Sequence, residues 1–198
     1  MFGDFWRVFR QRYPTFIGAL VGGIGLLLVF LVAAGALFGV VAGSLHYTAT
    51  EKFCAESCHE MTIAASEHKG TVHDTNRSGV RADCAACHIP KDPVGMIVRK
   101  IEASREVWGH LTGKIDTKEK YEKHRAEMAQ TEWKRLKKTD SQVFRNCHNE
   151  AKFDPEKQSD RAKSRHQKGK AEGKTCIDCH FGIAHKEPEG PGPADIKF

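Results

Sequence analysis

The chain divides into one apolar segment and a much longer polar one. Residues 15 to 45, 31 positions in all, include no charged side chain, whereas Lys, Arg, Asp and Glu are frequent in every later stretch. About 20 apolar residues in a helix are enough to cross the hydrocarbon of a bilayer. The pattern therefore predicts a short N-terminal segment over residues 1–14, a transmembrane helix over residues 15–45 and a water-exposed domain over residues 46–198.

A cleaved signal peptide is the competing interpretation of this apolar segment. Ala33, Ala34 and Ala36 supply the small residues that a cleavage site needs. The apolar core of a signal peptide, however, has only about 7–15 residues. We therefore expect the segment to be retained as a single membrane anchor.

The charges that flank the apolar segment indicate its orientation. Arg7, Arg10 and Arg12 precede it, whereas residues 46–50 include no Lys or Arg. The positive-inside rule then places the N-terminus in the cytoplasm and the polar domain across the membrane. In a bacterium this predicts a single-pass protein of the inner membrane with its domain in the periplasm. Nucleic acid is therefore not an expected partner, despite the formal net charge of +6.

The polar segment shows little strand alternation and three stretches typical of helices. We expect these helices over residues 92–113, 117–137 and about 154–169. The first and third begin with Asp-Pro, which is a common N-cap followed by a proline at the first helical position. Their apolar faces are thin for a protein core. The sequence therefore predicts a mainly α fold, with a small domain whose order depends on a bound cofactor.

Four of the seven cysteines stand directly before a histidine. Two of these pairs complete the motif Cys-x-x-Cys-His, which is typical of covalent haem c attachment. In that motif the two thiols bond to the porphyrin and the histidine is delivered to the iron as an axial ligand. We number the candidates in chain order as site 1 (Cys54, Cys58, His59), site 2 (Cys84, Cys87, His88), site 3 (Cys147, His148) and site 4 (Cys176, Cys179, His180).

Sites 1 and 3 depart from the motif. Three residues rather than two separate Cys54 from Cys58, and Phe144 stands where site 3 would have its first cysteine. We interpret site 3 as a haem held by one thioether through Cys147, with Phe144 packed on the ring edge. The alternative is a lost site in which Cys147 is a free thiol. The sequence thus predicts a multihaem cytochrome c domain with four haems.

Two other uses of these cysteines compete with haem attachment. Disulfides are the usual fate of cysteines in an oxidising compartment, but seven is an odd number. Zinc also binds paired cysteines with nearby histidines. Neither interpretation explains why four cysteines each precede a histidine.

A low-spin haem needs a second axial ligand. Seven histidines lie outside the Cys-His pairs and are available for this role: His46, His68, His73, His110, His124, His166 and His185. Three of them stand out by position. His73 lies between the first two sites, His166 lies before the last site, and His185 follows His180 by five residues.

Six segments of the chain match a known family: residues 53–61, 76–82, 110–117, 145–149, 175–180 and 182–185. In these segments the chain resembles the membrane-anchored quinol dehydrogenases of the NapC/NirT type. These are tetrahaem c-type cytochromes that include the small subunit of the cytochrome c nitrite reductase complex. The similarity runs from the anchor to about His185.

The resemblance implies a particular set of iron ligands. Met61, rather than His59, would be the protein ligand of the first haem, whose other face would stay open to quinol. For the other haems the expected pairs are His166 with His88 at site 2, His185 with His148 at site 3, and His73 with His180 at site 4.

The resemblance also implies a candidate quinol site. Oxidation of a quinol releases two protons with two electrons, so the site needs a hydrogen-bond donor and a base. Lys100 and Glu106 occupy positions that resemble the family's quinol-site lysine and acidic residue. Six residues apart on one helix, they would not share a face well.

We therefore expect a protein of anaerobic respiration that oxidises membrane quinol and passes electrons through its haems to a periplasmic reductase of the nitrate or nitrite type. The alternative is the reverse flow, from a periplasmic oxidase such as a hydroxylamine-oxidising enzyme to quinone. A third interpretation is a permanently docked electron-transfer subunit that never meets quinone. The expected partners are the membrane quinone pool and the periplasmic enzyme, with assembly as a homo-oligomer or as a stable complex with that enzyme.

Overall fold

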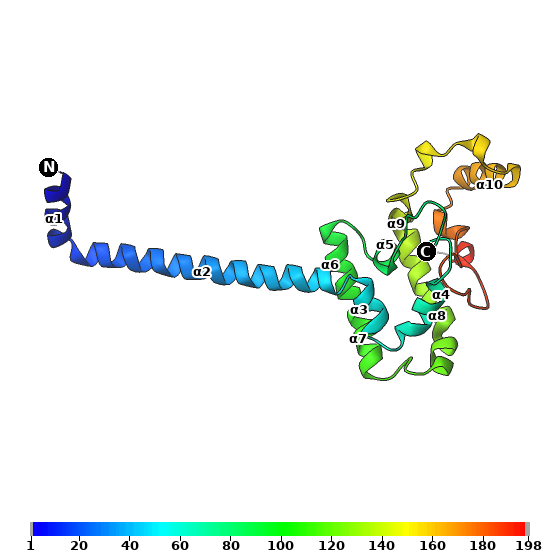
Figure 1. Ribbon diagram of the computed structural model, residues 1–198, viewed down its shortest axis with the longest axis horizontal. Coiled ribbons are helices and arrows are strands. Elements are labelled where there is room, and N and C mark those ends of the chain that lie inside the picture. Colours follow the sequence, from blue (N-terminus) through cyan, green and yellow to red (C-terminus); the bar gives the residue numbers. More distant parts are fainter. Residues whose placement is uncertain (1, 197–198) are drawn as a thin grey trace. The chain divides into compact units, whose positions relative to one another are not determined.

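The computed structural model describes residues 2–196, apart from the side chains of residues 2, 5, 6 and 17. Regular structure in this range is helical, without strands, which confirms the expected mainly α class. The chain forms two compact units, Met1–His46 and Tyr47–Phe198. The α-helices, shown in Figure 1, are α1 (Phe2–Arg12), α2 (Pro14–Tyr47), α3 (Glu51–Glu56), α4 (Met61–His68), α5 (Cys84–His88), α6 (Pro93–Glu102), α7 (Ser104–Leu111), α8 (Lys118–Lys138), α9 (Gln142–Arg145) and α10 (Asp160–Ala171).

Helix α2 is the apolar element of the first unit. It has 34 residues, and it is long and apolar enough to cross a membrane. Its large side chains are exposed, with Leu26 at 74 % and Phe38 at 75 %. Such exposure is unfavourable in water and favourable in a bilayer. The single apolar helix expected from the sequence is therefore present.

The second unit has a small apolar core. Among its described residues the buried hydrophobic side chains are Tyr121, Trp133, Leu136, Val143 and Ile177. Native domains of about 150 residues normally bury roughly two thirds of the surface that their unfolded chains expose. So few core side chains cannot organise a unit of this length by themselves. The thin core expected from the sequence agrees with a domain that is filled by a cofactor.

Helix α8 organises this core. Thr117 caps it by accepting a hydrogen bond from the Lys120 N–H, so the expected helix over residues 117–137 is confirmed to within a residue. Near its C-terminal end Lys137 donates to the carbonyl oxygens of Pro193, at 2.9 Å, and of Ile196, at 3.2 Å. Lys137 also pairs with the buried Asp178 at 2.8 Å. These contacts fix two short 3₁₀ helices, η3 (Cys176–Asp178) and η4 (Pro193–Asp195), against α8.

The other two expected helices differ from the structure. The helix over residues 92–113 is interrupted at Ala103, which gives α6 and α7. The helix expected from residue 154 begins only at Asp160, because Asp154 caps a separate 3₁₀ helix, η2 (Pro155–Lys157), and Ser159 caps α10. Two caps so close together divide one predicted helix into two. A further short helix, η1 (Glu150–Lys152), precedes them.

Candidate functional site

The cysteines lie on short helices or at their ends. Asp83 caps α5, which carries both thiols of site 2, and Thr50 caps α3, which carries Cys54. Helix α3 packs against α4 and α5, and α5 packs against α9, which precedes site 3. All seven thiols are unpaired, so the disulfide interpretation is wrong for this structure.

The histidines of sites 2, 3 and 4 each face one other histidine. The ring centroids are 6.1 Å apart for His88 and His185, 6.3 Å for His148 and His73, and 5.8 Å for His180 and His166. Two imidazoles on opposite sides of one metal, each about 2 Å from it, have centroids roughly 6 Å apart. The three pairs therefore have the spacing that bis-histidine ligation of a haem iron requires.

These pairs correct the expectation from the sequence. It placed His166 opposite His88, His185 opposite His148, and His73 opposite His180, and all three pairs were wrong. The same six histidines take part, but with other partners. The expected pairs came from the resemblance to the family, whereas in the structure the segment after site 4 folds back onto α4 and brings His185 to site 2.

The residue after His185, Lys186, fixes the position of this C-terminal segment beside α4. Glu67 of α4 accepts a hydrogen bond from the Lys186 N–H at 3.0 Å, and Arg125 of α8 donates to the Lys186 carbonyl at 3.2 Å. The buried Arg125 and Glu67 are also joined by two hydrogen bonds, of 2.6 and 2.9 Å. The residue after His185 is thus held between two helices, and His185 lies at site 2.

His73 is positioned by a tight loop between α4 and α5. Asp74 accepts from the Gly70 N–H at 2.8 Å and from Arg81 at 2.7 Å, and Arg81 also pairs with Glu51 of α3. The Gly70 N–H and the Arg81 guanidinium lower the pKa of Asp74 to about 2, so it is ionised at neutral pH. The loop therefore holds His73 towards site 3 through charged hydrogen bonds.

The second ring nitrogen of these histidines also bears on metal binding. His88 Nδ1 donates to Glu132 Oε1 at 3.0 Å, and His166 Nδ1 donates to Gln158 Oε1 at 2.8 Å. Metal-binding histidines usually donate one ring N–H in this way, which leaves the other nitrogen for the metal. His73 Nδ1 is instead buried without a hydrogen-bond partner. An orphaned buried ring nitrogen is costly in a protein interior unless a ligand satisfies it.

The four sites adjoin one another in chain order. Sites 1 and 2 adjoin, because Cys54, Cys84 and Cys87 line the same pocket. Sites 2 and 3 adjoin, because α5, which carries both thiols of site 2, packs against α9, which precedes Cys147. Sites 3 and 4 adjoin, because the Ile177 N–H, next to Cys176, donates to Ser141 Oγ at 3.2 Å, directly before α9.

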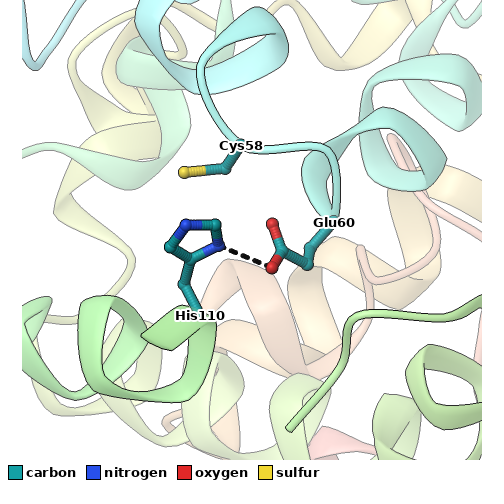
Figure 2. Close-up of side chains that lie close together, drawn as sticks. All are labelled: Cys58, Glu60 and His110. Atoms are coloured by element: carbon teal, nitrogen blue, oxygen red, sulfur yellow. Dashed lines mark hydrogen bonds and ion pairs between the residues drawn. The ribbon is translucent and has the colours of Figure 1, made fainter. Parts of the chain in front are cut away.

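At site 1 a carboxylate joins the cysteine and histidine side chains, and Figure 2 shows Cys58, Glu60 and His110 close together. His110 Nδ1 donates to Glu60 Oε1 at 2.6 Å, and His59 Nε2 lies 3.3 Å from the same oxygen. The ligand atoms of Cys58, Glu60 and His110 lie within 4.8 Å of one another, a spacing that could hold a metal ion. Of these residues the sequence singled out only Cys58 as part of a site, and the buried Glu60 was missed.

Met61 and Cys54 line a mostly apolar pocket that also includes Cys84, Cys87, His88 and His185 of site 2. Met61 begins α4 and is 39 % exposed. The structure therefore brings Met61 and one thiol of site 1 into the same pocket.

At site 3, Phe144 packs against the core cluster of Trp133, Leu136, Val143 and Ile177. The sequence predicted contact with the edge of a haem, and the structure gives this side chain a role in the protein core. The exposed Cys147 follows α9, and the Cys147 and His148 N–H groups both donate to the Phe144 carbonyl, at 3.0 and 2.8 Å. A cysteine at position 144 would therefore weaken the core as well as add a thiol.

The two candidate quinol residues lie on different helices. Lys100 of α6 donates to the Thr48 carbonyl at 2.7 Å, and burial lowers its pKa, although the Cys54 thiolate acts in the opposite direction. Glu106 of α7 pairs with Arg99 at 2.7 Å and has a 66 % exposed side chain. Lys100 therefore lies beside site 1, while Glu106 is held by an arginine that the sequence analysis did not single out.

The comparisons with known proteins agree with this geometry. Residues 19–190 match the NapC/NirT cytochrome c family, N-terminal region. The cytochrome c-type protein NapC of Haemophilus influenzae is 45 % identical over 95 % of this chain and 90 % of its own length. The denitrification system component NirT of Stutzerimonas stutzeri is 45 % identical over 84 % of this chain and 83 % of its own length.

Another relative is longer than this chain. The cytochrome c-type protein TorY of Escherichia coli O157:H7 is 45 % identical over 84 % of this chain, which spans only 46 % of TorY. No solved structure matches the chain. The family match and the relatives together show that the chain belongs to the NapC/NirT cytochrome c family, membrane-anchored electron-transfer proteins with covalently bound haem c that are linked to periplasmic reductases.

Proposed function

We propose that the protein oxidises membrane quinol and delivers the electrons to a periplasmic reductase of the nitrate or nitrite type. The observation that carries this proposal is the series of four adjoining Cys-His sites, in each of which the histidine has a second imidazole, with ring centroids 5.8 to 6.3 Å apart. The relative NirT is named a denitrification system component, which supports a link to nitrogen-oxide respiration. When bound, haem c supplies one-electron redox chemistry.

Each group of side chains has a defined part in this proposal. All seven thiols form thioethers, with a single one at site 3, so the chain holds four haems. The haem irons would be held by Met61 at site 1, by His88 and His185 at site 2, by His148 and His73 at site 3, and by His180 and His166 at site 4.

Lys100 is the proposed donor to the quinol oxygen. It lies beside Cys54, where its partly buried ammonium can hold a ring oxygen next to site 1. Glu106 is the proposed proton acceptor, and Arg99 sets the position of its carboxylate. Because the carboxylate is largely exposed, protons that it accepts can pass directly to water.

The same proposal includes an orientation. Residues 1–14 lie in the cytoplasm and residues 46–198 in the periplasm, as the arginines before the apolar segment indicate. Site 1 belongs to the unit that begins at Tyr47 and is therefore in the periplasm in this orientation.

Turnover with a short-chain quinol in detergent tests the proposal. Lys100→Met should lower the rate about 10²-fold with haem content unchanged, a typical loss when a positioned catalytic group is removed. Lys134→Met, which alters an exposed lysine on α8, is the matched control and should behave as wild type. An unchanged rate in Lys100→Met would favour a docked subunit that never meets quinone.

A further inference from the structure

The histidine pair at site 1 differs from the three other pairs in that a carboxylate contacts both of its rings. His88, His148 and His180 each face a second imidazole. His59 also lies near a second imidazole, since its ring centroid is 6.1 Å from that of His110. In this pair, however, a carboxylate oxygen of Glu60 contacts both rings, at 3.3 Å from His59 Nε2 and 2.6 Å from His110 Nδ1.

This oxygen accepts a hydrogen bond from His110 Nδ1 and lies within ion-pair distance of His59 Nε2. Figure 2 shows the hydrogen bond between Glu60 and His110, which fixes the carboxylate. A ring nitrogen that pairs with a fixed carboxylate is not available to bind iron, so this contact bears directly on whether His59 can act as a ligand.

Glu60 depends on its few polar contacts. The residue is only 5 % exposed, and its second oxygen, Oε2, is buried without a hydrogen-bond partner. Loss of a donor to a buried carboxyl group is costly, so the hydrogen bond from His110 holds Glu60 in place.

The position of Glu60 in the sequence makes this contact specific. It stands between His59 and Met61, directly before the first turn of α4. The His110 side chain that anchors Glu60 belongs to α7, the helix that also carries Glu106. The hydrogen bond between α7 and the start of α4 therefore passes through Glu60, the residue between the candidate ligands His59 and Met61.

We propose that Glu60, fixed by His110, is a positioning residue that holds the His59 imidazole away from the iron of site 1. This inference rests on the proposed haem at that site. Met61 then stays the protein ligand, and the opposite axial face stays open. Because a histidine beside its attachment cysteine normally reaches the iron, removal of this restraint should let His59 bind.

The test uses the full-length holoprotein in detergent, with the high-spin haem signal in electron paramagnetic resonance and carbon monoxide binding as readouts. Wild type should show one high-spin haem that binds carbon monoxide. Glu60→Ala should lose both features while it keeps its haem content, because His59 becomes a ligand. Glu127→Ala is the matched control, since Glu127 accepts from His124 Nδ1 at 2.9 Å away from the four sites.

Two further variants decide between restraint of His59 and a general disturbance. The double variant Glu60→Ala with His59→Ala should regain the high-spin haem, and His59→Ala alone should resemble wild type. His110→Phe should behave as Glu60→Ala does, and it provides the same test if Glu60→Ala fails to incorporate haem.

The outcomes separate this inference from the function on which it rests. A high-spin haem that persists in both Glu60→Ala and His110→Phe would overturn the role of Glu60 and leave the proposed function intact. A high-spin signal or carbon monoxide spectrum that changes in His59→Ala relative to wild type would overturn it as well, because His59 would then be a ligand in wild type. A wild-type protein without any high-spin haem would overturn the proposed open site 1 itself, and the inference with it.

Discussion

The imidazole of His185 lies against that of His88, with ring centroids 6.1 Å apart, although 97 positions separate the two residues (185 minus 88). The Glu67–Arg125 pair makes this possible by holding Lys186, the next residue, between α4 and α8. Site 2 is thus completed by the C-terminal part of the chain. The pairing leads to a test that does not depend on turnover.

His185→Ala should convert one low-spin haem to high spin. The substitution is then repeated in a variant that lacks Cys84 and Cys87 and therefore has no haem at site 2. If His185 belongs to site 2, His185→Ala should add no high-spin haem in this variant. If His185 belongs to site 3, the new high-spin haem should still appear. Electron paramagnetic resonance checks both, and His124→Ala, outside the pairs, should leave the spectrum unchanged.

Glu132→Gln should raise the midpoint potential of one haem. The carboxylate accepts from His88 Nδ1 at 3.0 Å and favours the oxidised, more positive state of that site. Loss of about 1.4 kcal/mol of this preference corresponds to about 60 mV for one electron. A spectroelectrochemical titration measures the shift, with Glu127→Gln as the control. Unchanged potentials would contradict a role for Glu132 in tuning site 2.

The Glu67–Arg125 pair should make the stability of the second unit depend on pH. Burial raises the pKa of Glu67, but the hydrogen bonds from Arg125 and the Lys186 N–H outweigh it and lower the pKa below 4.5. A lowered folded-state pKa means that the contribution is fully present above the unfolded value and is lost as the pH falls through the folded one. Glu67→Gln should therefore destabilise the protein at pH 7 and flatten its acid dependence.

The size of this effect follows from burial of the pair. Arg125 and Glu67 have side chains that are 7 % and 18 % exposed. Breaking a buried pair by removing one charge costs about 3–5 kcal/mol. Denaturant unfolding of the holoprotein at pH 7 and pH 4 measures it. An equal loss of stability at both pH values would indicate a packing defect in place of a lost ion pair.

Site 3 predicts a distinctive attachment. Cys147→Ser should remove one haem from the intact mass, because Cys147 is the sole thiol of that site. Phe144→Cys should keep four haems and move the pyridine haemochrome band of the single-thioether haem to the position of a two-thioether haem. It should also lower stability, since Phe144 packs on the core cluster. A wild-type mass with three haems would show that site 3 is lost.

Potentiometry tests the direction of electron flow. If quinol is the donor, most haem potentials should lie above that of the membrane quinone pool, because electrons move towards the higher potential. Potentials mostly below the pool would favour the reverse flow from a periplasmic oxidase. The measurement uses the intact holoprotein in the same detergent as the turnover assay.

The sequence by itself determined the features that depend on neighbouring residues. The apolar run of residues 15–45 required a membrane-compatible helix, and four Cys-His pairs indicated haem attachment, because the chemistry of each pair is complete within a few residues. Thr117 correctly marked the start of α8 for the same reason. A cap acts on the N–H groups two or three residues later and needs no distant partner.

Only the tertiary structure decided which histidine faces which site. His73, His166 and His185 each face a histidine of an attachment site, and their partners depend on long-range contacts such as Glu67 with Lys186 and Arg81 with Glu51. The bridge from Glu60 to His110 joins residues 50 positions apart and left no local pattern in the sequence. The pairing of histidines depends on which distant segments of the chain pack together. That packing is stabilised by ion pairs and hydrogen bonds between distant residues, which no short motif encodes.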